Sequence, residues 1–170
     1  MRMVQLCVSS FIAGPAGWAA DWAWGLPLIV LTVIIHVSGL VLIRDKTVRP
    51  LEHVIRRQQR KTLFVTVLGT VTLLVISLHA FEAAIWAAAY RLLHAIPDNS
   101  SAMLYSLNAI TSYGHTNLEL EQRWHLMGAL EALNGWLLFG LSTAFLFAII
   151  QQFGSPESGD ETARSASITA

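Results

Sequence analysis

The sequence predicts an all-α membrane protein with three transmembrane helices, and its composition and hydropathy pattern are the observations that predict it. Of the 170 residues, 54% are hydrophobic and 13% are charged, whereas about a quarter of a typical soluble domain is charged. A membrane-spanning helix needs roughly 20 mostly apolar residues. Three runs meet this requirement: Leu26–Ile43, Thr62–Tyr90 and Leu126–Ile150.

The N-terminal segment, residues 1–25, has no single assignment. Val4–Ala20 is 17 residues long, is moderately apolar and contains Pro15. It fits a signal-like segment, an interfacial helix or an extra span, and the sequence leaves these three open. Three tryptophans that precede the first apolar run are typical of a membrane interface. They are Trp18, Trp22 and Trp24.

The first span and a basic loop make up residues 26–61. Arg44–Lys61 holds seven of the eleven Lys and Arg residues of the chain. Because short loops rich in Lys and Arg stay cytoplasmic, we expect residues 44–61 and the C-terminus in the cytoplasm, and the chain in the inner membrane of a cell. The formal net charge is zero, which gives no reason to expect a nucleic-acid partner. The single cysteine, Cys7, excludes an intramolecular disulfide.

Residues 62–151 form a predicted module of two spans joined by a short helix and a polar row, and residues 152–170 form a polar tail that we expect to be disordered. Asn99–Ile110 has a mostly apolar helical pattern, and Asn99, Ser100 or Ser101 can cap its start. At 1.5 Å per residue this helix is about 15 Å long, half the thickness of a bilayer. The polar row follows: Thr111, Ser112, Tyr113, Gly114, His115, Thr116 and Asn117.

We interpret the short helix and the polar row as a re-entrant loop. Irregular backbone at membrane depth survives only where it is buried in protein or lines water. The alternative is an amphipathic helix that lies flat on the outer surface, but a flat helix gives no reason for the polar row.

The order of outer helix, short helix, polar row and inner helix resembles the pore module of the potassium-channel superfamily. The similarity covers residues 79–151. In small bacterial pore-loop ion channels, an HxxE motif in the outer helix is followed by a pore helix that ends in TVGYGD. Here the matching features are His79-x-x-Glu82 and, without gaps, Ser112–Asn117. Trp124 stands seven residues after Asn117, where a tryptophan commonly opens the inner helix of that group.

The resemblance implies a homotetramer in the lipid bilayer that passes monovalent cations, with K⁺ as the expected permeating ion, no resident cofactor and no enzymatic activity. It assigns the seven residues of the polar row, Thr111–Asn117, to the selectivity filter. Tyr105 and Asn108 become supporting residues of the pore helix. In the same group, a glycine near Gly135 serves as a gating hinge, which places Asn134 and Gly135 at a hinge or cavity.

The filter departs from the potassium-channel pattern. In the ungapped register Gly114 matches the first filter glycine and Thr116 replaces the second, whereas a competing register pairs Tyr113-Gly114 with the family's Tyr-Gly. Either register loses one glycine. Because aiming successive carbonyls at one axis requires dihedrals that glycine accepts freely, we expect a wider filter in which side chains supply ligands, His115 among them. A ring of protonated His115 would repel cations, so we expect lower conductance below about pH 6.

Ionisable residues inside the membrane are costly and favour a functional interpretation. His79 and Glu82 are neighbours on one helix face. They either brace the pore helix or, in the sharper hypothesis, bind a metal. Glu131 is expected to pair with a pore-helix polar group such as Asn108, or to stay protonated. His36 is expected to be a hydrogen-bonded interhelical histidine.

Asn134 and Gly135 lie near the middle of the last span. Asn134 could point into a water-filled cavity, with Gly135 as the hinge. Packing of small residues at a helix crossing is the alternative.

Two other classes remain beside the cation channel. One is a non-conducting accessory or structural protein with a pore-like fold, which the degenerate filter favours. The other is a metal-dependent membrane enzyme built on His36, His79, Glu82 and His125. It is disfavoured because the sequence has no repeated histidine pairs of the HxxxH or HxxHH kind.

Overall fold

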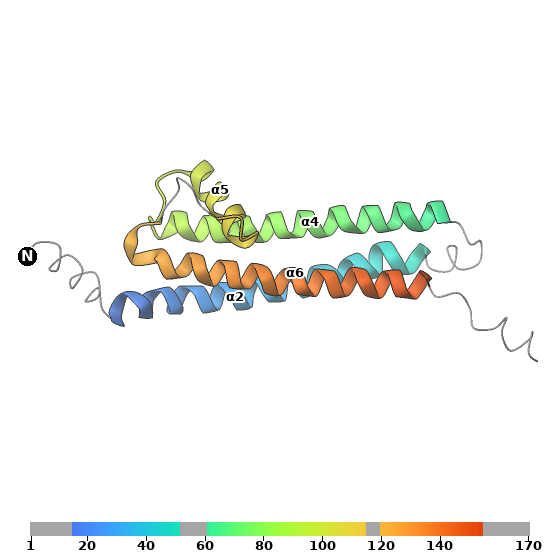
Figure 1. The fold of residues 1–170 in the computed structure, drawn as a ribbon, viewed down its shortest axis with the longest axis horizontal. Helices are drawn as coiled ribbons and strands as arrows, with labels where there is room; N and C mark the ends of the chain where they lie inside the picture. The colour runs from blue at the N-terminus through green and yellow to red at the C-terminus, as the bar shows by residue number, and fades with distance from the viewer. Residues whose placement is uncertain (1–14, 52–60, 115–119, 155–170) are drawn as a thin grey trace, which may run out of the picture.

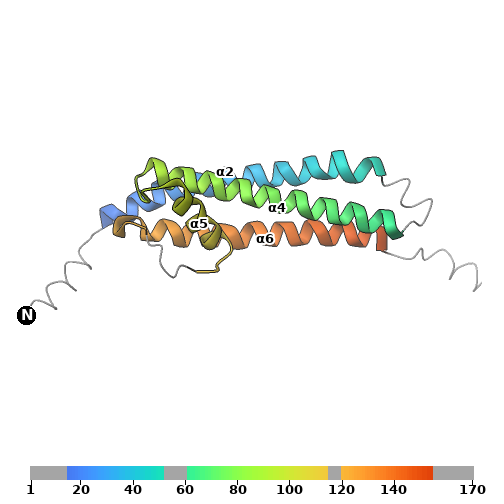
Figure 2. The same cartoon turned by 90° about the horizontal axis from the view of Figure 1, so that it is seen from above.

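A computed structural model describes residues 15–51, 61–114 and 120–154 of the chain. Within these ranges the chain is helical. The elements are α2 (Pro15–Ile43), the short π-helical turn η1 (Arg44–Val48), α4 (Lys61–Leu92), α5 (Asn99–Ile110), the 3₁₀ turn η2 (Gln122–Trp124) and α6 (His125–Gly154). Figures 1 and 2 show α2, α4 and α6 lying side by side along the length of the molecule, with α5 at one end of this bundle.

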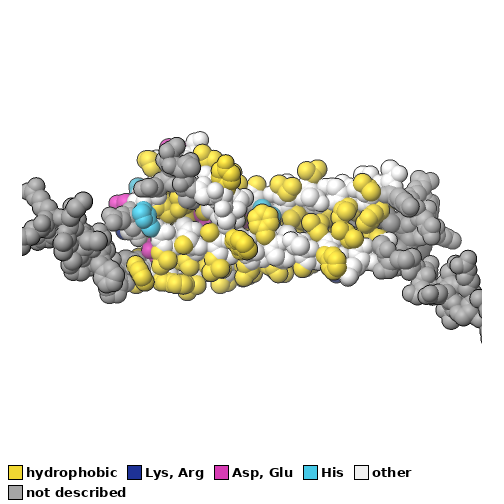
Figure 3. Space-filling model, in the orientation of Figure 1, with side chains coloured by type: hydrophobic (Ala, Val, Ile, Leu, Met, Phe, Trp, Pro, Cys, Tyr) yellow, Lys and Arg dark blue, Asp and Glu magenta, His cyan; other side chains and the backbone are white. Residues whose placement is uncertain are grey.

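Three helices are long and apolar enough to cross a membrane: Trp18–Leu51, Thr62–Leu92 and His125–Phe153. The prediction of an all-helical chain with three such helices is confirmed. The chain is therefore consistent with a multi-pass membrane protein. Large apolar side chains such as Val30, Leu73 and Phe147 face outward, and Figure 3 shows apolar side chains spread along the bundle. An outward-facing apolar surface of this extent suits lipid as its surroundings.

The first long helix begins earlier than its apolar run predicts. α2 starts at Pro15 and includes Trp18, Trp22 and Trp24, which we expected to precede the span. Residues 4–14 of the ambiguous N-terminal segment lie outside the described residues, as do 52–60 of the basic loop and 155–170 of the tail.

The short helix α5 has the predicted bounds but a different cap. Asp98 has an extended backbone, with φ −134° and ψ 158°, and its side chain accepts a hydrogen bond from the Ser101 backbone N–H at 2.8 Å. This bond stabilises the carboxylate and lowers the pKa of Asp98. Asn99 instead accepts a hydrogen bond from Arg91. The prediction of a cap at Asn99, Ser100 or Ser101 was wrong by one or more residues.

Two glycines of α6 let α5 approach closely. A Cβ atom on Gly128 would lie 2.1 Å from the Tyr105 hydroxyl, and one on Gly135 would lie 2.0 Å from the backbone oxygen of Ile110. Seven residues are about two helical turns, so both glycines lie on one face of α6. Because Tyr105 sits at the first glycine and Ile110 at the second, α5 runs in the same direction as α6 and ends near Gly135.

The interior has two main apolar parts. At the end that carries α5, a core of aromatic and small side chains includes Trp86, Tyr90, Trp124 and Met127. Toward the opposite end, aliphatic residues such as Val71 and Ile149 fill the space between the long helices.

Candidate functional site

The polar row begins at the end of α5, and the structure describes its first four residues. Ser112 adopts φ +55° and Gly114 adopts φ +91°. The backbone N–H groups of Ser112 and Tyr113 donate to Ala109 and Asn108, at 2.9 and 3.0 Å. The turn is therefore tied back to α5 rather than continuing its helix.

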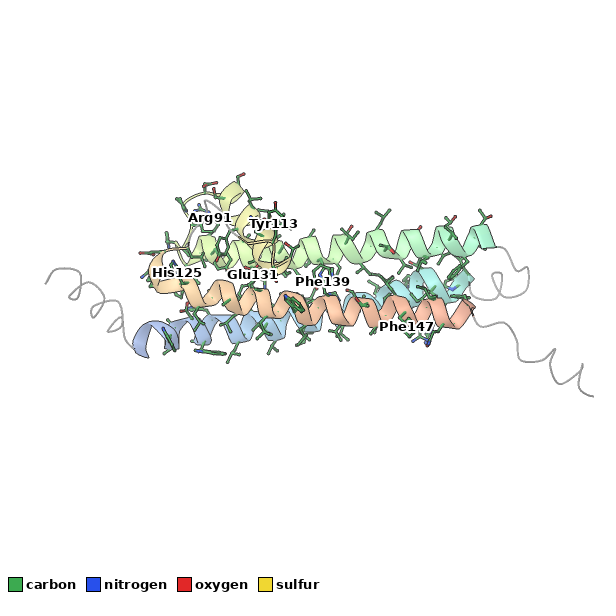
Figure 4. The ribbon with its side chains drawn as sticks, in the orientation of Figure 1. Arg91, Tyr113, His125, Glu131, Phe139 and Phe147 are labelled. Atoms are coloured by element: carbon green, nitrogen blue, oxygen red, sulfur yellow. The ribbon has the colours of Figure 1, made fainter. Side chains whose placement is uncertain are left out.

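All four of these residues, Thr111–Gly114, are exposed on the single chain, and the Tyr113 side chain is 84% exposed. Figure 4 marks Tyr113 at the end of α5, with Glu131 and Phe139 on α6. One side-chain contact fixes the turn to α6: the Trp136 indole N–H donates to the Ser112 hydroxyl at 2.8 Å. His115, Thr116 and Asn117 lie outside the described residues, so both filter registers stay predictions.

A first buried polar cluster, which we call the Glu131 cluster, joins α5 to the long helices. It consists of Glu131, Tyr90 and Ser106, and each side chain is fully buried. The Tyr90 hydroxyl donates to Glu131 Oε2 at 2.6 Å, and Ser106 makes a hydrogen bond with Glu131 Oε1. Ser106 also lies 2.7 Å from the backbone oxygen of Ala83 on α4. One carboxyl group thus connects α4, α5 and α6.

Glu131 does pair with a polar group of α5, as expected, but the partner is Ser106 and not Asn108, the residue named as an example. Residues two apart on a helix point about 200° apart, so Ser106 and Asn108 cannot both face Glu131. Ser106 faces α6, whereas the backbone oxygen of Asn108 accepts from Tyr113. Tyr105 does support α5, because its ring packs edge-on against Tyr90 with 5.3 Å between ring centroids.

A second buried polar cluster, which we call the His–Glu cluster, joins the three long helices. It consists of His36 of α2, His79 and Glu82 of α4, and Ser142 of α6. His36 Nδ1 lies 2.8 Å from Glu82 Oε1. The Nε2 atoms of His36 and His79 each lie 3.0 Å from Ser142 Oγ.

The expectation that His79 and Glu82 brace the pore helix is therefore wrong, since their contacts run to α2 and α6. The side chains of the HxxE motif face His36 because α2 packs along this side of α4. His36 is hydrogen-bonded between helices, as expected. His125 does not join the cluster: its Nε2 lies 2.8 Å from the Leu120 backbone oxygen at the start of α6. The four-residue set of the enzyme hypothesis is not assembled.

Asn134 and Gly135 both make packing contacts. Asn134 is buried, and its amide N–H donates to the Thr32 hydroxyl of α2 at 2.9 Å. Gly135 lies against the Ile110 backbone. Asn134 thus points to a neighbouring helix and not into a water-filled cavity, and these contacts favour the packing interpretation over the hinge.

Sequence reasoning missed Tyr90, Ser106 and Ser142. Each is a polar residue within an otherwise apolar helix, which is a signal that it has a partner, but the sequence does not say which partner. Comparisons with protein-family models, with curated proteins and with solved structures find no match for this chain.

Proposed function

We propose that the chain is the pore-loop subunit of a homotetrameric channel, which conducts monovalent cations passively across the inner membrane. The observation that carries this proposal is the position of the exposed polar turn Thr111–Gly114 against the middle of α6. Three steps support it: the depth of the turn, its exposure, and the exposed face of α6 that continues from it.

The depth follows from helix geometry. Ile110, the last residue of α5, packs on Gly135, which is ten residues into α6 (His125–Gly154). Ten residues rise about 15 Å, which is about half the hydrocarbon thickness. An α5 that lay flat on the membrane surface would not reach this level of α6, so the geometry favours the re-entrant interpretation.

The exposure of the turn then needs an explanation. Backbone without regular structure at this depth must be covered by protein or face water. Thr111, Ser112, Tyr113 and Gly114 are uncovered on the single chain. Copies of the chain arranged around a water-filled axis would meet this requirement, and closed rotational symmetry is the usual form of such assemblies. The resemblance of residues 79–151 to potassium-channel pore modules implies four copies.

An exposed face of α6 continues from the turn toward the other end of the bundle. Trp136, which bonds to Ser112, is followed on the same side of the helix by Gly140, Thr143 and Phe147, and all four are exposed. The spacing of four, three and four residues keeps them on one side. This face carries no charged side chain, so it is suited to line an aqueous path or to meet the same face of another copy.

The chemistry of the described turn suits monovalent cations. It offers hydroxyl and backbone carbonyl oxygens, the ligands that replace the hydration shell of K⁺ in selectivity filters. Gly114 adopts φ +91°, which glycine accepts without a steric penalty. Selectivity for K⁺ over Na⁺ is tested by the reversal potential under bi-ionic conditions. Thr116→Gly, which restores the second glycine of the ungapped register, is expected to raise potassium selectivity.

The enzyme alternative has less support. His36 and Glu82 are completely buried, and a catalytic metal site keeps one position open for water or substrate. A non-conducting accessory protein is the outcome to distinguish by experiment.

The test uses purified full-length protein in liposomes, with cation flux as the readout. Thr143→Trp places a bulky ring on the exposed α6 face and is expected to reduce flux at least about tenfold. Val30→Trp, on an exposed position of α2, is the matched control and is expected to leave flux unchanged. Equal flux in both variants would contradict the assignment of the pore to this face of α6.

A further inference from the structure

The His–Glu cluster has chemistry that the channel proposal does not use. Its donors come from three helices that are far apart in the sequence: His36 from α2, His79 and Glu82 from α4, and Ser142 from α6. The side chains of His36 and Glu82 are 0% exposed and that of His79 is 12% exposed. Two imidazoles and a carboxylate with one ligand atom each lie within 4.8 Å of one another.

The hydrogen bonds of the cluster can be followed proton by proton. Glu82 Oε1 accepts from His36 Nδ1–H, because a carboxylate has only acceptors. A neutral His36 then has a bare Nε2, which accepts from the Ser142 hydroxyl. Ser142 has a single proton, so the second contact of its oxygen requires that His79 Nε2–H donates to it.

This arrangement leaves two buried acceptor atoms, His79 Nδ1 and Glu82 Oε2, facing each other with no proton between them. If His79 is neutral and protonated at Nε2, its Nδ1 is a bare lone pair that faces the second carboxylate oxygen, Glu82 Oε2, at 3.5 Å. Both atoms are buried, and neither makes a hydrogen bond to another described residue. Two buried acceptors that face each other repel, and a cation between them removes the repulsion.

We propose that the His–Glu cluster binds a divalent transition-metal ion of the zinc class. The two atoms lie 3.5 Å apart, which is longer than a charge-assisted hydrogen bond of about 2.8 Å. Two ligands on a tetrahedral zinc ion, with bonds of about 2.0–2.1 Å, are roughly 3.3 Å apart.

The donor set selects the class of metal. Imidazole nitrogen together with a carboxylate oxygen suits zinc and its neighbours in the first transition row, whereas Mg²⁺ and Ca²⁺ prefer oxygen ligands alone. Binding of the ion displaces the Nδ1 proton of His36, so that His36, His79 and Glu82 each supply one ligand. Because the site is buried between α2, α4 and α6, the ion has a structural role: it holds α2 against the two helices of the pore module.

The metal site is tested on full-length protein purified in detergent with a tag that contains no histidine. After incubation with Zn²⁺ and dialysis, wild-type protein is expected to retain about one Zn²⁺ per chain. Glu82→Gln and His79→Gln, which each remove a ligand, are expected to retain less than about a tenth of that amount. Glu131→Gln is the matched control, since it changes another buried glutamate that lies outside the His–Glu cluster, and it is expected to retain zinc as wild type does.

Cobalt gives a readout that does not depend on the folding of a variant. Wild-type protein loaded with Co²⁺ is expected to show the visible absorption bands of a tetrahedral nitrogen and oxygen site. Wild-type protein that retains no Zn²⁺ and shows no such bands overturns the proposal, and the cluster is then a metal-free polar contact between the three long helices. Equal zinc retention in Glu82→Gln and wild type also overturns it. Both readouts are independent of cation flux, so the metal site and the channel proposal can fail separately.

Discussion

Two glutamates are buried among the residues that the structure describes, and their surroundings differ in one decisive respect. Glu131 makes a hydrogen bond with Tyr90 through one oxygen and with Ser106 through the other. Glu82 receives one from His36 on one oxygen, while its second oxygen faces His79 Nδ1 without a hydrogen bond. The first arrangement is complete as it stands and holds α5 in position. The second needs a cation.

Metal removal is expected to give the largest difference in stability between variants of the two clusters. Chelation of zinc-loaded wild-type protein should lower the free energy of unfolding by about 4 kcal/mol, the linkage expected for an ion present at about a thousand times its Kd. Glu131→Gln should show the same loss, and Glu82→Gln should show none. The measurement is thermal or denaturant unfolding in detergent with and without chelator. A chelator effect of equal size in Glu82→Gln would show that the ion binds elsewhere.

Truncation of Glu131 is expected to give the next largest effect. Glu131→Ala leaves the buried hydroxyl of Tyr90 without its partner, at about 1–3 kcal/mol for a buried group left unsatisfied, while Ser106 keeps its contact with the Ala83 backbone oxygen. Glu131→Gln keeps polar atoms at the same place and should lose about 1 kcal/mol. Unfolding measurements give the energies, and hydrogen exchange of α5 amides should rise in Glu131→Ala only. Unchanged exchange in α5 would contradict its role as the strut of this helix.

The close packing of α5 on α6 is tested by comparing two glycine substitutions, Gly135→Ala and Gly69→Ala. Gly135→Ala puts a Cβ atom 2.0 Å from the Ile110 backbone oxygen, and overpacking of this kind usually destabilises by about 1–3 kcal/mol. Gly69→Ala has no atom within 4 Å of the new Cβ and should stabilise α4 by up to about 1 kcal/mol. Opposite signs in the unfolding free energies support the close approach. A neutral Gly135→Ala would show that α5 does not end at this level.

The smallest effect concerns the neutral contact between α2 and α6. Asn134→Ala removes the hydrogen bond to Thr32 and should lower the unfolding free energy by about 1 kcal/mol. Zinc retention should not change. A loss of zinc in this variant would mean that Asn134, and not the His–Glu cluster alone, sets the position of α2.

Much of the fold is readable from the sequence because it depends on local properties. The apolar runs predict the three long helices, and the pattern NSSAMLYSLNAI predicts α5 with the bounds that the structure shows. Partners across helices are not readable in this way. Whether Glu131 contacts Ser106 or Asn108 depends on the rotation of α5 about its axis. His36 contacts Glu82 and Ser142, which are 46 and 106 residues away in the chain. These contacts depend on how α2 packs against α4 and α6.

The central claim is that copies of this chain enclose a cation path lined by the polar turn after α5. The measurement that tests it most directly is the recording of currents from purified full-length protein in planar bilayers with K⁺ on one side and Na⁺ on the other. The account predicts cation currents that fall when the external pH is lowered from 7.5 to 5.5 and that are reduced by Thr143→Trp. Reconstituted protein that passes no current at any voltage or pH would contradict it.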